Sequence, residues 1–143
     1  FEFMADRKYK AVANCIIGMP DENRELIFDT IRFVRKLPKN IDATGAYVFA
    51  PYHGTPLRDL AIQKGYIKEE DVVSLSLSSG SGSMLNMPQL SSNEIAGLAR
   101  TFAYYVKFPE SRWRDIKIAE KFDSEGDKMH EKLGKEFDQK YRI

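Results

Sequence analysis

The sequence has very little cysteine: Cys15 is the single cysteine in 143 residues. One cysteine excludes an internal disulfide, and it excludes any cysteine-rich metal site that this chain could build alone. The sequence also has no cysteine and histidine spacing typical of zinc sites, no internal repeat and no heptad run. Disulfide scaffolds, zinc domains and coiled coils are therefore not the classes to consider.

Excess charge and long apolar runs are also missing. The net charge of +1, with 43% hydrophobic and 30% charged residues, gives no electrostatic reason to bind nucleic acid or a membrane surface. No apolar run approaches the roughly 20 residues of a membrane span, and no secretory signal pattern is present. We therefore predict a cytoplasmic protein with one real core and with no nucleic-acid or membrane partner.

What the sequence does contain is a strand, a helix and a second strand over residues 11–55. Residues 11–17 are a nearly continuous apolar run, which predicts a strand buried on both faces. A helix follows, with Asp21 as its predicted cap and its end before Pro38. Its apolar stripe consists of Leu26, Ile27, Ile31 and Val34. Residues 44–50 predict a second strand, so we expect one parallel βαβ unit.

Each strand runs into a loop that is rich in turn formers. Because ligands of parallel α/β folds bind at the carboxyl ends of the strands, residues 18–21 and 51–55 are the first candidates for a site. Gly18 allows a backbone to approach a ligand closely, although the motif alone is more often a simple strand-to-helix turn. Tyr52 and His53 are an aromatic and a titratable residue on the second loop. A lone loop histidine is more often a surface residue, so both interpretations stay open.

The middle of the chain predicts a short helix and a flexible segment. Residues 56–64 predict a helix that begins after Thr55 and stops at Gly65. Residues 71–77 predict a short strand or an extended arm, and residues 78–83 predict a serine and glycine linker or mobile lid. The apolar residues beyond the linker are expected to cover another surface. They are Met84, Leu85, Met87 and Leu90.

The C-terminal third predicts helices. Ser91 and Glu94 have capping-box spacing ahead of an amphipathic helix that ends near Pro109. Another helical face holds Trp113, Ile116, Ala119 and Phe122. A narrow stripe in the last helix, expected to pack on its own core or on another copy, holds Met129, Leu133, Phe137 and Tyr141. His130 is predicted to be a surface residue among the charges.

Two segments resemble a known enzyme family. Residues 14–22, N-C-I-I-G-M-P-D-E, and residues 47–57, Y-V-F-A-P-Y-H-G-T-P-L, resemble the fifth and sixth strands of radical S-adenosylmethionine enzymes, especially members with an upstream cobalamin-binding domain. The resemblance extends through residues 64–67 and, more loosely, to residues 79–88. It implies an α/β fold: residues 1–77 form the C-terminal part of a partial TIM-like (βα)6 barrel, residues 78–90 a flexible loop, and residues 91–143 a helical extension.

The resemblance also implies a cofactor site. The family's fifth strand carries a glycine-x-isoleucine-x-glycine-x-x-glutamate pattern that contacts the adenine of S-adenosylmethionine; Ile16 and Gly18 match it, while Asn14 and Asp21 replace its first and last residues. The second loop is implied to line the same cavity. The implied cofactor-binding residues are Ile16, Gly18, Pro20, Asp21, Pro51, Tyr52 and His53. No catalytic residue is assigned.

Family members bind a 4Fe-4S cluster through three cysteines after their first strand, and this motif is absent here. The chain begins with Phe1 instead of methionine, and residues 1–9 are typical of the end of a helix. We therefore expect a fragment of an iron-sulfur oxidoreductase or transferase, inactive without its N-terminal part, which acts on a small-molecule substrate. An upstream cobalamin domain would favour methyl transfer, with ring formation or rearrangement as other outcomes.

Two other classes stay open. One is a non-catalytic binding or assembly module, in which the βαβ unit supports a helical region that docks a partner. The other is a fragment of a barrel hydrolase or isomerase that uses His53 with Tyr52. A half-barrel also has an open sheet edge, so we expect this chain to form a homodimer, which light scattering would detect.

Overall fold

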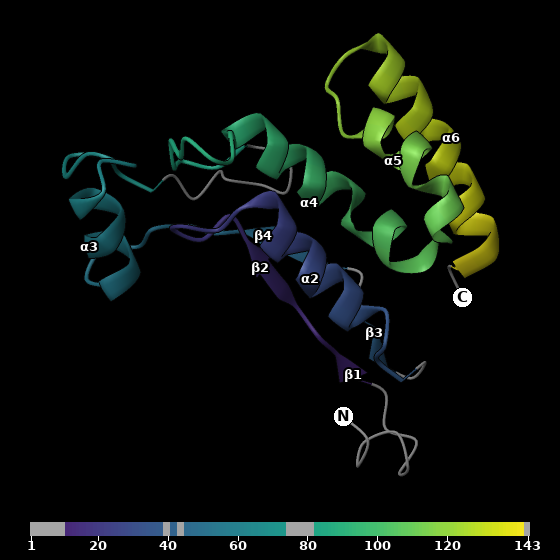
Figure 1. Cartoon of the computed structure of the whole chain (residues 1–143), viewed down its shortest axis with the longest axis horizontal. Helices are drawn as coiled ribbons and strands as arrows, with labels where there is room; N and C mark the ends of the chain where they lie inside the picture. The colour runs from purple at the N-terminus through teal and green to yellow at the C-terminus, as the bar shows by residue number, and fades with distance from the viewer. Residues whose placement is uncertain (1–10, 39–40, 43–44, 74–81, 142–143) are drawn as a thin grey trace.

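The computed structural model describes residues 11–38, 41–42, 45–73 and 82–141 (Figure 1). The strands are β1 (Ala11–Val12), β2 (Cys15–Ile17), β3 (Ile41–Asp42) and β4 (Ala46–Val48). The helices are α2 (Arg24–Val34), α3 (Pro56–Gln63), α4 (Ser92–Lys107), α5 (Trp113–Ala119) and α6 (Ser124–Tyr141), with a 3-10 turn, η1, at Glu110–Arg112. The predicted helix end at residues 1–9 and most of the predicted linker lie outside the described residues, whereas residues 71–73 are described and form no strand.

The four strands form two short parallel pairs. β1 pairs with β3, and β2 pairs with β4 so that Ile16 lies opposite Tyr47. In each pair α2 lies in the sequence between the two strands. This order confirms a parallel βαβ unit and a mixed α/β fold. In Figure 1 the strands lie behind α2, α4 crosses above them, and α5 and α6 lie together at one end of the molecule.

The prediction that the first strand is buried on both faces is wrong. Ile17 is fully buried in one core with apolar residues of α2 and α4, but Val12, Ile16 and Tyr47 are 69%, 50% and 57% exposed. Successive side chains of a strand point to opposite faces, and within the described residues helices cover only one of them. A continuous apolar run cannot reveal this, because it has no polar face.

α2 begins two residues later than the sequence indicated. Asp21 does not cap the helix, since its φ of 67° lies in the left-handed region while a capping residue needs extended backbone. Asn23 has that geometry, and its side chain accepts the Leu26 N–H at 3.0 Å. Of the predicted apolar stripe, Ile27, Ile31 and Val34 are buried and Leu26 is half exposed.

α4 begins as predicted and forms the centre of the core. The Ser91 hydroxyl accepts the Glu94 N–H, and the Glu94 carboxylate accepts the Ser91 N–H at 3.0 Å, which confirms the capping box. α4 packs against β4, α2, α5 and α6. The apolar residues just before it enter this core, because Leu85, Met87 and Leu90 are buried. They therefore cover the chain's own core.

The apolar stripe of α6 packs on the same chain. Leu133 is fully buried, and the Phe137 ring lies 5.6 Å from the Tyr104 ring of α4. The sequence left two partners open for this stripe, the chain's own core and another copy, and the structure shows it packed on the chain's own core. The predicted face of α5 is wrong at one position, because the helix ends at Ala119 and Phe122 is half exposed beneath the Arg100 guanidinium.

Glu120, directly after α5, joins three helices. Its carboxylate is almost fully buried and accepts hydrogen bonds from the Arg24 guanidinium of α2, the Tyr105 hydroxyl of α4 and, at 3.1 Å, the Lys117 ammonium of α5. Burial and the neighbouring carboxylate raise the pKa of Tyr105, which therefore stays protonated and donates. Removing Glu120 would leave buried donors without a partner.

We predict that Glu120→Ala lowers the free energy of unfolding by about 3 kcal/mol, because it breaks a buried charge network and leaves Arg24 unpaired. Urea denaturation of both proteins measures the loss. Lys117→Ala is the matched control: its ammonium is largely exposed, so the change should stay below about 1 kcal/mol. Equal losses from the two substitutions would contradict the central role of Glu120.

His130 of α6 is not the surface residue that the sequence indicated. It is partly buried, its ring lies 5.2 Å from the Tyr104 ring, and its Nε2 is 3.3 Å from both the Tyr104 hydroxyl and the Arg100 carbonyl oxygen. Burial and the positive charge of Arg100 lower the pKa of His130. Neutral imidazole is thus the form that the α4–α6 contact favours, although the hydrogen bond to the Arg100 carbonyl and the charge of Asp127 partly oppose this lowering of the pKa.

We predict that acid weakens the protein through this contact. The pKa of His130 is lowered in the folded state. Near and below the ordinary pKa of about 6.5, the unfolded chain therefore binds more protons than the folded protein does, so the free energy of unfolding falls as the pH decreases through that value. Urea denaturation of the native protein and of His130→Gln between about pH 7.5 and about pH 5 isolates the effect. A stability difference between the two that does not change with pH would refute it.

Candidate functional site

The two candidate loops begin at one edge of the sheet. β2 and β4 run parallel, and the Phe49 N–H donates to the Ile17 carbonyl at 2.8 Å where both strands end. Residues 18–23 and 49–55 therefore leave the same edge, as the sequence predicted. This is the edge at which parallel α/β folds present loops to ligands.

Glu22 closes the first loop. Its Oε2 atom accepts hydrogen bonds from the backbone N–H groups of Gly18 and, at 3.2 Å, of Met19. Burial raises the pKa of Glu22, while the two amides favour its ionised form. The sequence analysis assigned the acidic position to Asp21 and missed Glu22; the available signal was a carboxylate four residues after the glycine, where it can turn back to the loop amides.

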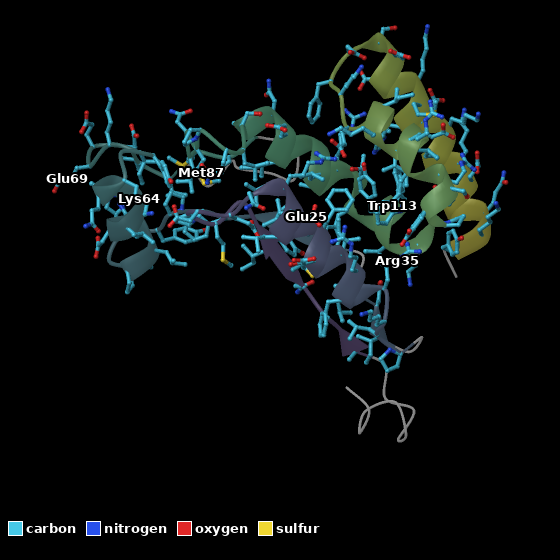
Figure 2. The ribbon with its side chains drawn as sticks, viewed as in Figure 1. Glu25, Arg35, Lys64, Glu69, Met87 and Trp113 are labelled. Carbon is cyan, nitrogen blue, oxygen red and sulfur yellow. The ribbon has the colours of Figure 1, made fainter. Side chains whose placement is uncertain are left out.

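Asp21 has a different role. Its carboxylate lies 2.7 Å from the Lys64 ammonium and accepts the Tyr66 hydroxyl at 2.9 Å, and both contacts lower its pKa. Lys64 follows α3 directly (Figure 2), so Asp21 ties the first loop to that helix. Pro20, the neighbouring predicted site residue, is partly buried.

The second loop is held by Arg58 of α3, a residue that the sequence analysis also missed. Arg58 is 2% exposed, and its guanidinium donates to the carbonyl oxygens of Pro51 at 3.0 Å, Glu69 at 2.9 Å and Asp71 at 2.7 Å. A guanidinium presents several donors in one plane, which suits it to gathering carbonyl groups from separate turns. An arginine in a short amphipathic helix gives no sequence signal of this burial.

The structure places the predicted second-loop residues unequally. Pro51 is buried under Arg58, whereas Tyr52 and His53 are exposed. Thr55 accepts the Arg58 N–H and caps α3. α3 thus joins the two loops, since Lys64 and Tyr66 hold the first and Arg58 holds the second. Tyr52 and His53 lie on the outside of this arrangement.

Ile16 presents an apolar surface beside the loops. It lies opposite Tyr47 in the register of β2 and β4, and both side chains are half exposed on the sheet face that no described helix covers. Gly18 follows two residues later with a φ of +81°, a conformation that favours glycine. Of the predicted site residues, Ile16 lies on this open face, beside Tyr47, whereas Gly18 is buried next to Ile95 of α4.

The chain's own residues do not fit an iron-sulfur cluster. Cys15 is partly buried on the covered side of β2, and burial raises the pKa of its thiol, which disfavours the thiolate that binds iron. Among the described residues no group of three histidine, cysteine, aspartate or glutamate side chains is arranged to hold a metal ion. In the same part of the chain, no helix combines the length and apolar character needed to cross a membrane.

Comparison with protein-family models, curated protein sequences and solved structures gives no significant match for this chain.

We predict that Gly18 tolerates alanine less well than Gly54 does. Both glycines have positive φ, +81° and +76°, so alanine should cost about 1–2 kcal/mol at either position. A Cβ at Gly18 would also lie 3.0 Å from Cγ2 of Ile95, while no atom lies within 4 Å of a Cβ at Gly54. Gly18→Ala should therefore lose about 1 kcal/mol more in urea denaturation.

A double-mutant cycle separates contact from backbone strain. Ile95→Ala removes the crowded methyl group, so adding Gly18→Ala in that background should cost about as much as Gly54→Ala does. A cost at Gly18 that is the same with isoleucine and with alanine at position 95 would contradict the close approach.

Proposed function

We propose that this chain forms the C-terminal, adenosyl-binding part of a radical S-adenosylmethionine enzyme with a partial (βα)6 barrel. The supporting observation is the half-exposed Ile16 on the open face of a parallel βαβ unit, two residues before Gly18 at positive φ. Ile16 offers an apolar side chain at the carboxyl edge of the sheet, which suits a flat heterocycle, while the missing Cβ of the buried Gly18 makes room for Ile95 of α4 and lets the loop turn there.

The open face suggests how an adenine ring would bind. Its flat surface would pack against Ile16 and Tyr47, which gain from burial because both side chains now contact water. The loop amides of Gly18 and Met19 already donate to Glu22, so they fix the loop's shape instead of binding the ligand. Asp21 and Arg58 hold the loops in place and do not contact the ring in this proposal.

The proposed role of this chain is limited to holding the adenosyl group and excluding water from one side of it. In the enzymes that it resembles, a reduced iron-sulfur cluster supplies the electron that cleaves the cofactor. The cysteines for such a cluster would have to come from outside these 143 residues, since the chain has only Cys15. The small-molecule substrate and any cobalamin would also be bound with the help of that other part.

S-adenosylhomocysteine, a stable analogue, tests the adenosyl site directly. We predict saturable NMR shifts at the Ile16 methyl groups and the Gly18 amide, and a loss of affinity of about tenfold in Ile16→Asp, because a charge replaces the apolar contact. Val12→Asp is the matched control: Val12 is exposed on the uncovered side of the preceding strand, away from the loops. No saturable shift, or an equal loss in Val12→Asp, would overturn the proposal.

Sequencing the coding DNA upstream of Phe1 in the same reading frame separates the enzyme from the binding module. A strand followed by three cysteines at the cluster spacing would support the enzyme class, and the longer protein would then be purified without oxygen and tested for cofactor cleavage. An in-frame stop directly upstream would rule out a cluster on this polypeptide and would favour a binding module.

A further inference from the structure

A pocket lies between α2 and α5, separate from the two loops. Its volume is about 540 Å³, within the range of roughly 300–1,000 Å³ typical of small-molecule sites. It is lined by Asn23, Arg24, Glu25, Phe28, Arg32, Gln89 and Trp113. Figure 2 shows Glu25 on α2 and Trp113 on α5, the helices on its two sides. No residue of this lining belongs to the proposed adenosyl site.

The wall of this pocket is aromatic. The Phe28 and Trp113 rings meet edge to face with centroids 5.3 Å apart, and the Tyr105 ring contacts both, at centroid distances of 5.0 and 5.5 Å. The Arg24 guanidinium lies 5.1 Å from the Phe28 centroid. The indole Nε1 of Trp113 is buried and has no hydrogen-bond partner, so one donor of this wall lacks an acceptor. The aromatic rings of the wall favour contact with the flat ring of a ligand.

The pocket holds two cations of different kinds. Arg24 is fixed, because its partner Glu120 is buried. Arg32 is exchangeable: its ion pairs with Glu25 at 2.7 Å and Asp29 at 2.9 Å join side chains that are largely exposed, and pairs of this kind contribute little. An incoming anion can therefore replace Glu25 and Asp29 on Arg32 without a large loss of interaction energy.

An anion would bind here by exchange with carboxylates. The lining has two guanidinium groups, and that of Arg24 is paired with the buried Glu120. Arg32 is paired with the exposed Glu25 and Asp29, which a ligand's anionic group would replace. The pocket also includes the first turn of α2, an eleven-residue helix whose N-terminal dipole attracts negative charge. Arginine can bind a carboxylate or a phosphate through two hydrogen bonds. The aromatic wall and the exchangeable arginine lie in the same pocket, so one ligand can use both.

We propose that this pocket binds an aromatic anion, with its ring against Phe28 and Trp113 and its carboxylate or phosphate on Arg32. Either an aromatic carboxylate or a nucleoside monophosphate has this chemistry. The proposal does not depend on the adenosyl site, since the two use different residues: Arg24, Phe28 and Arg32 of α2 here, and Ile16 and Tyr47 on the uncovered face of the sheet there.

Trp113 reports on the pocket, because it is the chain's single tryptophan. The intact protein is titrated with benzoate and, separately, with adenosine monophosphate, and the tryptophan emission is followed with excitation at the red edge of its absorption. Benzylamine has the ring of benzoate with a positive charge, and acetate has the carboxylate without a ring. We expect saturable change with at least one aromatic anion and none with benzylamine or acetate.

Two substitutions should act in opposite directions. Arg32→Gln should weaken binding by about fivefold, because it removes the exchangeable cation. Glu25→Gln should strengthen it by about twofold, because it removes a carboxylate that competes for Arg32. Arg114→Gln is the matched control, an exposed arginine of α5 outside the pocket lining, and should leave affinity unchanged.

The outcomes decide the proposal and its ligand. Saturation by benzoate alone indicates a carboxylate ligand, and saturation by adenosine monophosphate alone indicates a nucleotide. Saturation by both indicates any aromatic anion. Each of these results supports the proposal if Arg32→Gln weakens the binding. Absence of saturation with both anions overturns the proposal. So does an equal response to benzylamine, or an equal loss in Arg114→Gln. Circular dichroism and urea denaturation verify that each variant is folded.

Discussion

The position of α2 depends on one buried carboxylate. Glu120 accepts hydrogen bonds from Arg24 of α2 and Tyr105 of α4, and it follows the last turn of α5. A buried carboxylate without partners would be costly, but here a guanidinium, a hydroxyl and an ammonium offset the loss of water. The same contact brings Phe28 against Trp113, so the helical packing and the aromatic wall of the pocket between α2 and α5 have one origin.

Arginine guanidinium groups hold the turns in place. Arg35, directly after α2, donates from Nη1 to the carbonyl oxygens of Tyr105, Val106 and Phe108 at 2.6, 3.0 and 2.8 Å, where α4 ends and its last carbonyls lack helical partners. Arg58 does the same for the turns around α3. The end of α4 and the turns around α3 are therefore fixed by arginine side chains that accept no hydrogen bonds themselves and donate to several carbonyl groups at once.

Local signals in the sequence were sufficient for the starts of α3 and α4 and insufficient for burial. The Ser91 and Glu94 capping box and the Thr55 cap depend on residues three apart, so the sequence contains them completely. The exposure of Ile16 and the burial of Arg58 and His130 depend on elements far along the chain. Whether Asn23 or Asp21 caps α2 depends on backbone torsions, which the sequence does not give. The role of Glu22 in closing the first loop depends in the same way on the conformation of that loop.

The C-terminal helices are needed for the candidate site although they contribute no residue to its open face. Two- and three-residue parallel strands have too few hydrogen bonds to be stable alone. α4 packs against β4, and Ile95 comes so close to Gly18 that only glycine fits without displacement. The first loop is therefore shaped from two sides, by Glu22 within the loop and by Ile95 from α4. Because α5 and α6 in turn hold α4, the geometry at Ile16 depends on the whole core.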